Sequence, residues 1–87
     1  MKTTSLEALS LSNLISERLE LFFQSHATSL PINLHAVILE QVERPLIKQT
    51  LQITNGNQIK AADILGVNRN TLRKKIKLFK IDLAHYK

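Results

Sequence analysis

The chain has 87 residues, enough for one domain with a thin core, and its 44% hydrophobic content excludes wholesale disorder. The absence of cysteine excludes disulfides and thiolate zinc sites, and no apolar run reaches the ~18 residues of a membrane span. Residues 1–56 carry four basic and five acidic side chains, whereas residues 57–87 carry eight basic and two acidic ones. This asymmetry favours a polyanion-binding end, although a solvated lysine-rich helix face would give the same pattern.

The first predicted helix covers residues 9–25, where apolar side chains recur at spacings of three and four residues. Residues 1–5 show no such period, and we expect them to fray. The apolar stripe consists of Leu11, Leu14, Ile15, Leu19, Phe22 and Phe23. Pro31 disfavours helix at Leu30 and therefore separates this helix from the next.

A second helix is predicted over residues 33–53, because its apolar period continues through Pro45 without a change of phase. An interior proline removes one backbone hydrogen bond and costs about 3 kcal/mol, so we expect a kink there. The apolar face consists of Leu34, Val37, Ile38, Val42, Leu46, Ile47 and Leu51.

The apolar surface of two such long helices exceeds what a small C-terminal unit can cover, so we assign the excess to a second copy of the chain. The expected dimer interface comprises Leu14, Ile15, Leu19, Phe22, Phe23, Val37, Ile38, Val42 and Leu46.

The segment after residue 53 has the layout of a helix-turn-helix over residues 57–79. Gly56 is suited to closing the preceding helix, and Asn57 to capping a short helix over residues 58–65. Gly66 and Val67 would make the turn, and Asn68 would cap a last helix over residues 69–79. Small Ala62 is expected where the two helices touch. The expected apolar side also includes Ile59, Leu65, Val67, Leu72, Ile76 and Phe79. Residues 81–87 are expected to form a tail that is loose at its end.

The last predicted helix carries no acidic residue between positions 69 and 80. Arg69, Asn70 and Arg73 lie in its first turns, where a recognition helix meets base edges in the major groove. Lys74, Lys75 and Lys77 are better placed for phosphates. Asn57 and Lys60 are candidates for a further phosphate at the preceding helix N-terminus. Purely structural roles remain open. Asn57 and Asn68 would then act only as helix caps, Thr71 would only stabilise the first helical turn, and the lysines would form a solvated helix face.

The chain shows no catalytic or metal-binding pattern. His26, His35 and His85 are too widely spaced to share a helical face, and no nucleophile–base pair or glycine-rich phosphate loop is present. We therefore expect no enzymatic activity, cofactor or small-molecule substrate. The N-terminus lacks a secretory signal, so we expect a cytoplasmic protein.

The segment GNQIKAADILGVNRNTLRKKIK, residues 56–77, resembles the Fis family of bacterial DNA-binding proteins and, more closely, the C-terminal domain of NtrC-type regulators. The stretch VERPLIKQTL, residues 42–51, is also similar, including Pro45. The resemblance implies a homodimer whose first two helices interlock. By resemblance, Asn68, Arg69, Thr71, Arg73 and Lys74 contact DNA, while Asn57, Lys60 and Lys75 contact its backbone. No β-hairpin arm of the kind found in Fis is expected.

The sequence thus predicts an all-α, single-domain protein over residues 1–87, with dimerisation helices at about 9–53 and a helix-turn-helix at 57–79. The predicted function is sequence-specific binding of double-stranded DNA in the bacterial nucleoid, as a transcriptional regulator or nucleoid-associated protein. The alternative is a helical interaction module whose basic helix docks an acidic partner.

Overall fold

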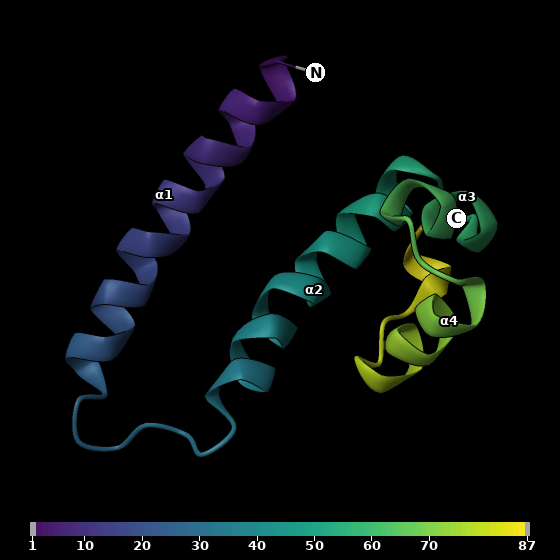
Figure 1. Cartoon of the computed structure of the whole chain (residues 1–87). Coiled ribbons are helices and arrows are strands. Elements are labelled where there is room, and N and C mark those ends of the chain that lie inside the picture. The colour runs from purple at the N-terminus through teal and green to yellow at the C-terminus, as the bar shows by residue number, and fades with distance from the viewer. Residues whose placement is uncertain (1, 87) are drawn as a thin grey trace. The chain divides into compact units, whose positions relative to one another are not determined.

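The computed structural model describes residues 2–86, with side chains from residue 10 onward, and within this range every regular element is helical (Figure 1). The elements are α1 (Lys2–Ser25), α2 (Leu34–Ile53), α3 (Gln58–Leu65), α4 (Arg69–Leu78) and a short 3-10 helix, η1 (Leu83–Tyr86). The predicted all-α class with four helices is therefore confirmed. None of these helices is both long and apolar enough to cross a membrane.

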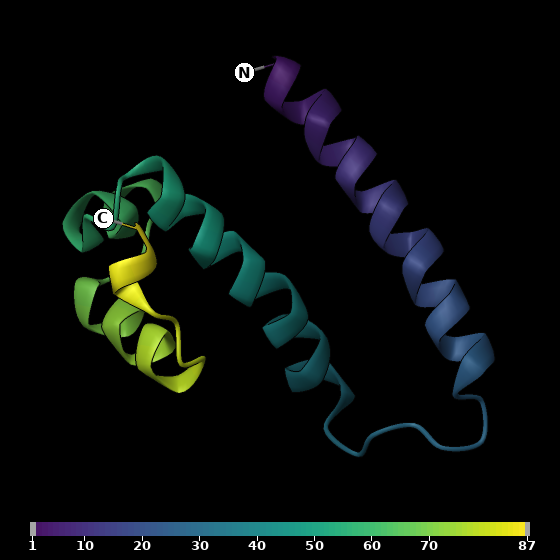
Figure 2. The ribbon, with the colours of Figure 1, turned by 180° about the vertical axis from the view of Figure 1, so that it is seen from behind.

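Helix α1 belongs to a first unit, residues 1–34, and runs unbroken from Lys2 (Figure 2). The prediction that residues 2–5 fray was wrong, whereas residue 1 lies outside the described range. Residues 2–8 contain neither glycine nor proline, so nothing in this segment interrupts the helix. Among the described side chains of α1 none is buried, and Leu11, Leu14 and Leu21 are more than half exposed.

Helix α2 belongs mostly to the second unit, residues 35–87, and continues through Pro45 as predicted. The expected kink at this proline stays a prediction. Ile47 and Leu51 in the C-terminal half of α2 are buried, whereas Val42 and Leu46, which precede them in the chain, are exposed. Only the C-terminal part of the apolar face of α2 is thus covered within the unit.

The core is formed where the end of α2 meets α3, α4 and the tail. Its buried apolar residues are Ile47, Leu51, Ala61, Ala62, Leu72, Ile76, Phe79, Ile81 and Tyr86. Ala62 is only 1% exposed, as expected for the small residue at the α3–α4 contact. The sequence interpretation was wrong for Ile59 and Val67, which are 54% and 41% exposed and do not belong to this cluster.

The C-terminal tail packs on the core up to Tyr86, so the prediction of a loose end was wrong for the described residues, and residue 87 lies outside them. Ile81 and Tyr86 are buried, and the Cβ and carbonyl group of Tyr86 lie about 3.5 Å from where a Cβ on Gly56 would stand. The Asp82 carboxylate accepts a hydrogen bond from the Ala84 backbone at 3.1 Å, which starts the 3-10 turn. The tail therefore closes over the α2–α3 turn.

Three successive helices end with the same pair of hydrogen bonds, the Schellman motif. Directly after α2, the Gly56 N–H donates to the Leu51 carbonyl oxygen at 2.8 Å, and the Asn55 N–H donates to the Gln52 carbonyl oxygen at 3.3 Å. The residue at the left-handed position is therefore Asn55, with φ 54°, and Gly56 follows it at φ 82°.

The other two motifs end α3 and α4. Gly66 takes the left-handed position after α3, with φ 72°. After α4 that position belongs to Lys80, with φ 55°, and Ile81 N–H donates to Ile76 at 3.0 Å. An L-residue with a side chain pays about 1–2 kcal/mol for this conformation, so Lys80 is a strained position.

The strain at Lys80 predicts that Lys80→Gly stabilises the fold by about 0.5–1 kcal/mol, after the greater entropy of the unfolded glycine chain is subtracted. Urea denaturation followed by circular dichroism measures the change. Lys77→Gly is the matched control, because it removes the same charge inside α4 and should destabilise by about 1 kcal/mol. Equal destabilisation by both substitutions would contradict the assigned strain.

The packed tail predicts that Tyr86→Ala destabilises the protein by roughly 2–4 kcal/mol, because a buried aromatic ring is lost. Its exposed neighbour His85, whose ring meets the Tyr86 ring edge-on at 5.2 Å, provides the control: His85→Ala is expected to cost at most about 1 kcal/mol. Thermal unfolding of both variants checks the difference, and a Tyr86→Ala variant as stable as the control would show that the tail is not part of the core.

Candidate nucleic-acid interface

Two asparagine caps start the helices of the helix-turn-helix. The Asn57 side-chain oxygen accepts a hydrogen bond from the Lys60 backbone N–H at 3.1 Å, and the Asn68 oxygen accepts one from the Asn70 N–H at 2.7 Å. Both capping predictions are confirmed. Both caps and the Lys60 side chain are exposed, so capping leaves their other polar atoms accessible.

Helix α4 has one buried side and one exposed side. Leu72 and Ile76 are 1% and 6% exposed, and Phe79 at the helix end is also buried. Nine of the ten predicted DNA-contact residues are exposed: Asn57, Lys60, Asn68, Arg69, Asn70, Thr71, Arg73, Lys74 and Lys77. The buried stripe therefore holds α4 so that its cationic and amide groups face solvent.

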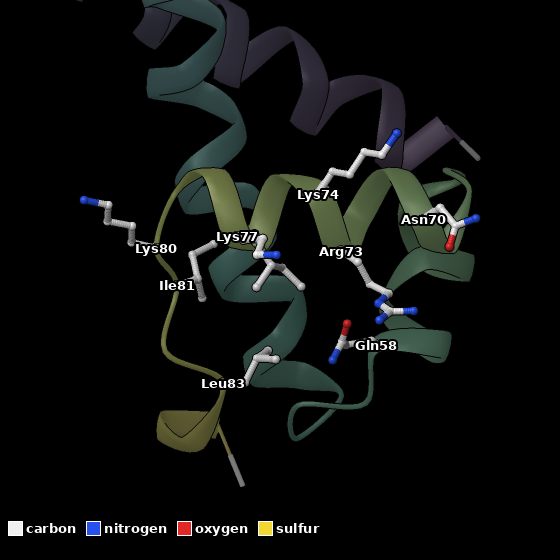
Figure 3. A pocket seen from close by; sticks show the side chains of 9 residues that line it. Gln58, Asn70, Arg73, Lys74, Lys77, Lys80, Ile81 and Leu83 are labelled. Carbon is white, nitrogen blue, oxygen red and sulfur yellow. The ribbon is translucent and has the colours of Figure 1, made fainter.

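A hollow of about 900 Å³ runs along one flank of α4 and is lined mainly by basic and amide side chains (Figure 3). Its lining includes Gln58, Asn70, Arg73, Lys74, Lys77 and Lys80, with Ile76, Ile81 and Leu83 at its floor and end. Arg73 extends from α4 toward Gln58 at the start of α3, whereas Lys74 points away from Gln58. Side chains from both helices of the motif thus line one basic surface.

A second hollow, of about 560 Å³, lies between the N-termini of α3 and α4. It is lined by Gln58, Ile59, Asn68, Arg69, Asn70 and Arg73. Sequence reasoning missed Gln58, which lines both hollows, and left Lys80 out of the site. Gln58 is the first residue of α3, directly after the Asn57 cap, and that position was the available signal.

Thr71 and Lys75 lie on the other flank of α4, where both line a small apolar groove beside α2. Lys75 is half-buried, and its Nζ lies 2.8 Å from each carboxylate oxygen of Glu43 on α2. The Lys75 amine is therefore engaged by α2, although the sequence assigned it to the DNA backbone.

Arg44 joins α2 to the end of α4. Its guanidinium donates to the Phe79 carbonyl oxygen at 2.7 Å and to the Glu40 carboxylate at 2.9 Å. The same group lies 5.0 Å from the centre of the Phe79 ring. Arg44 thus satisfies a carbonyl at the C-terminus of α4, where a positive charge also interacts favourably with the helix dipole.

Among the side chains that the structure describes, residues 10–86, no group of three histidine or acidic residues is placed to hold a metal ion. What the arrangement offers chemically is a set of hydrogen-bond donors and positive charges on one helix. Such a set suits phosphates and base edges.

The chain matches the model of the "Bacterial regulatory protein, Fis family" over residues 38–79. It is 41% identical over 66 residues to a "Putative Fis-like DNA-binding protein" of Neisseria meningitidis, covering 76% of this chain and 84% of that protein. It is also 45% identical over 49 residues to the "DNA-binding protein Fis" of Mannheimia haemolytica, covering 56% of this chain and 50% of that protein.

A third relative is the "DNA-binding transcriptional regulator NtrC" of Azospirillum brasilense, 52% identical over 68 residues. That alignment covers 77% of this chain but only 14% of the relative, so the chain corresponds to a small part of such regulators. No solved structure matches the chain. The family model and the near full-length Neisseria relative identify this chain as a member of the Fis family of bacterial regulatory proteins.

Proposed function

We propose that the chain binds double-stranded DNA sequence-specifically as a homodimer and acts as a transcriptional regulator or nucleoid-associated protein. The observation that carries this proposal is the exposed side of α4, which holds cations and amides without an acid over residues 69–80. The buried Leu72 and Ile76 fix the orientation of that side. The names of the relatives, DNA-binding protein Fis and DNA-binding transcriptional regulator NtrC, support the same function.

Arg69, Asn70 and Arg73 are proposed to read base edges in the major groove. All three line the hollow between the two helix N-termini. An arginine can donate two hydrogen bonds to guanine O6 and N7, and an asparagine can pair in a similar way with adenine. Lys74 and Lys77, further along α4, are proposed to contact phosphates, which orient the protein without reading sequence.

The start of α3 is proposed to bind a further phosphate. The first N–H groups of a helix lack partners within the helix, and they attract anions. The Asn57 side-chain oxygen occupies only one of these groups, that of Lys60. The amide nitrogen of Asn57 and the exposed Lys60 amine remain on the same end of α3.

The apolar side chains left outside the core support a homodimer. Leu14, Phe23, Val42 and Leu46, all from the expected interface, are between 40% and 58% exposed. The remaining five, Ile15, Leu19, Phe22, Val37 and Ile38, are only half-buried. A second copy of the chain would cover this surface and place two recognition helices on successive major grooves, with half-sites about 34–36 Å apart or less if the DNA bends.

The domain organisation proposed here is one Fis-like domain over residues 1–87. Residues up to Ile53 would form the dimer core and residues 57–79 the DNA-binding motif. Its proposed location is the bacterial cytoplasm, on the nucleoid.

Arg69→Ala is predicted to weaken binding to the preferred duplex by roughly 1–3 kcal/mol and to relax the preference at one base position. Lys77→Ala should instead weaken binding to all duplexes alike and reduce the steepness of the salt dependence. Fluorescence anisotropy with a duplex selected from a randomised pool, and with a scrambled duplex, measures both effects. If the ratio of the affinities for the selected and the scrambled duplex is the same in both variants, the assigned roles are wrong.

Leu14→Asp is predicted to convert the dimer into a monomer, because it would bury an unpaired carboxylate in the interface. Asn13→Asp is the matched control, since it adds the same charge on a neighbouring side of α1 and should leave the dimer intact. Sedimentation equilibrium distinguishes the two states, and a dimeric Leu14→Asp variant would refute the proposed interface.

The alternative function, an interaction module for an acidic partner, differs in its response to salt. DNA binding through several phosphates should weaken steeply as salt rises. Binding of the selected duplex at two salt concentrations therefore tests the proposal. Weak binding without sequence preference would favour the interaction module.

A further inference from the structure

Besides the apolar packing, two polar contacts join α2 to α4, and they are made by adjacent residues of α2. Glu43 holds the Lys75 amine, with both carboxylate oxygens at 2.8 Å, and Arg44 holds the Phe79 carbonyl at 2.7 Å. Glu43 and Lys75 are each 35% exposed, so water screens the pair only in part. We call the Glu43–Lys75 and Arg44–Phe79 contacts the two braces.

We propose that Glu43, Arg44 and Lys75 are positioning residues, which set the orientation of α4 for reading DNA without themselves touching it. The inference rests on the proposed function. It also reassigns Lys75 from a phosphate contact to an internal partner of α2.

The geometry at Lys75 carries this reassignment. A lysine that binds a phosphate leaves its ammonium free to meet the anion, whereas the Lys75 ammonium already meets both oxygens of a carboxylate. A phosphate approaching that amine would also approach the negative charge of Glu43, so the gain from the amine would be largely cancelled. The exposed Lys74 and Lys77 lack this neighbour among the ion pairs of the described residues.

The two braces act at different points of α4. One meets the middle of the helix through Lys75, and the other meets its C-terminal end through Phe79. The apolar contacts of Leu72 and Ile76 hold α4 against the core, but burial has little directional preference. Hydrogen bonds depend on direction, so two of them on one side restrict rotation of α4 about its axis.

The braces also connect the proposed dimer surface with the helix that is proposed to read DNA. Glu43 and Arg44 lie between Val42 and Leu46, which belong to the proposed dimer surface. A single segment of α2 would therefore contact the partner subunit and orient the recognition helix. We expect loss of a brace to reduce discrimination between duplexes more than it reduces affinity for DNA in general.

A double-mutant cycle tests the inference. Glu43→Gln, Lys75→Met and the double variant are titrated with the duplex selected from a randomised pool and with a scrambled duplex. The measured quantity is the ratio of the two affinities, from which long-range charge effects largely cancel. Lys74→Met, on the neighbouring residue of α4, is the matched control for loss of a lysine that binds phosphate.

We expect each single variant to lower the affinity ratio by about fivefold, and the double variant to lower it no further, because one interaction is removed in all three. Arg44→Met should lower the ratio to a similar degree. Lys74→Met should weaken both duplexes equally and leave the ratio unchanged. Should Glu43→Gln fail to fold, the exchanged pair Glu43→Lys with Lys75→Glu is expected to retain the wild-type ratio.

Two results would overturn the inference. In the first, Lys75→Met weakens both duplexes equally and reduces the slope of log affinity against log salt by about 0.9 per subunit, as expected for a lost phosphate contact. In the second, the effects of Glu43→Gln and Lys75→Met on the ratio are simply additive. A wild-type protein that binds neither duplex would overturn the proposed function, and this inference with it.

Discussion

Burial of one side of α4 determines how the C-terminal unit presents its charged side chains. Leu72 is 1% exposed and Ile76 is 6% exposed, and both belong to the cluster that contains Leu51 of α2 and Ala62 of α3. Once these side chains are buried, the helical period places Asn70, Lys74 and Lys77 on the far side of α4, while Arg69 and Arg73 remain exposed beside the buried stripe. An isolated lysine-rich helix of this length would be only marginally stable in water. Helix α4 therefore depends on the packing of Leu72 and Ile76 for its helical structure.

The helix ends make this packing possible within few residues. Asn55, Gly66 and Lys80 take left-handed conformations, and each lets the chain reverse direction directly after a helix. Two of these reversals are followed by asparagine caps, Asn57 and Asn68, which start the next helix at once. The α3 and α4 N-termini therefore lie beside each other, and the polar hollow between them follows from these turns.

Much of this arrangement could be predicted from the sequence because it depends on local signals. Apolar periodicity predicted the helices, and the caps at Asn57 and Asn68 predicted where α3 and α4 begin. Apart from the start of α1, the failures concern contacts between distant residues. Tyr86 packs against Gly56 and Lys75 pairs with Glu43, and neither contact leaves a periodic trace in the sequence. Likewise, no local rule distinguishes the exposed Ile59 from the buried Ala62.

We propose that the exposed side of α4 and the start of α3 together contact DNA. Backbone amide NMR of the labelled protein, titrated with a selected duplex, tests this claim residue by residue. This interface predicts that chemical-shift changes concentrate in residues 57–60 and 68–80, with little change along residues 10–25. Changes confined to residues 10–25, with α4 unaffected, would contradict it.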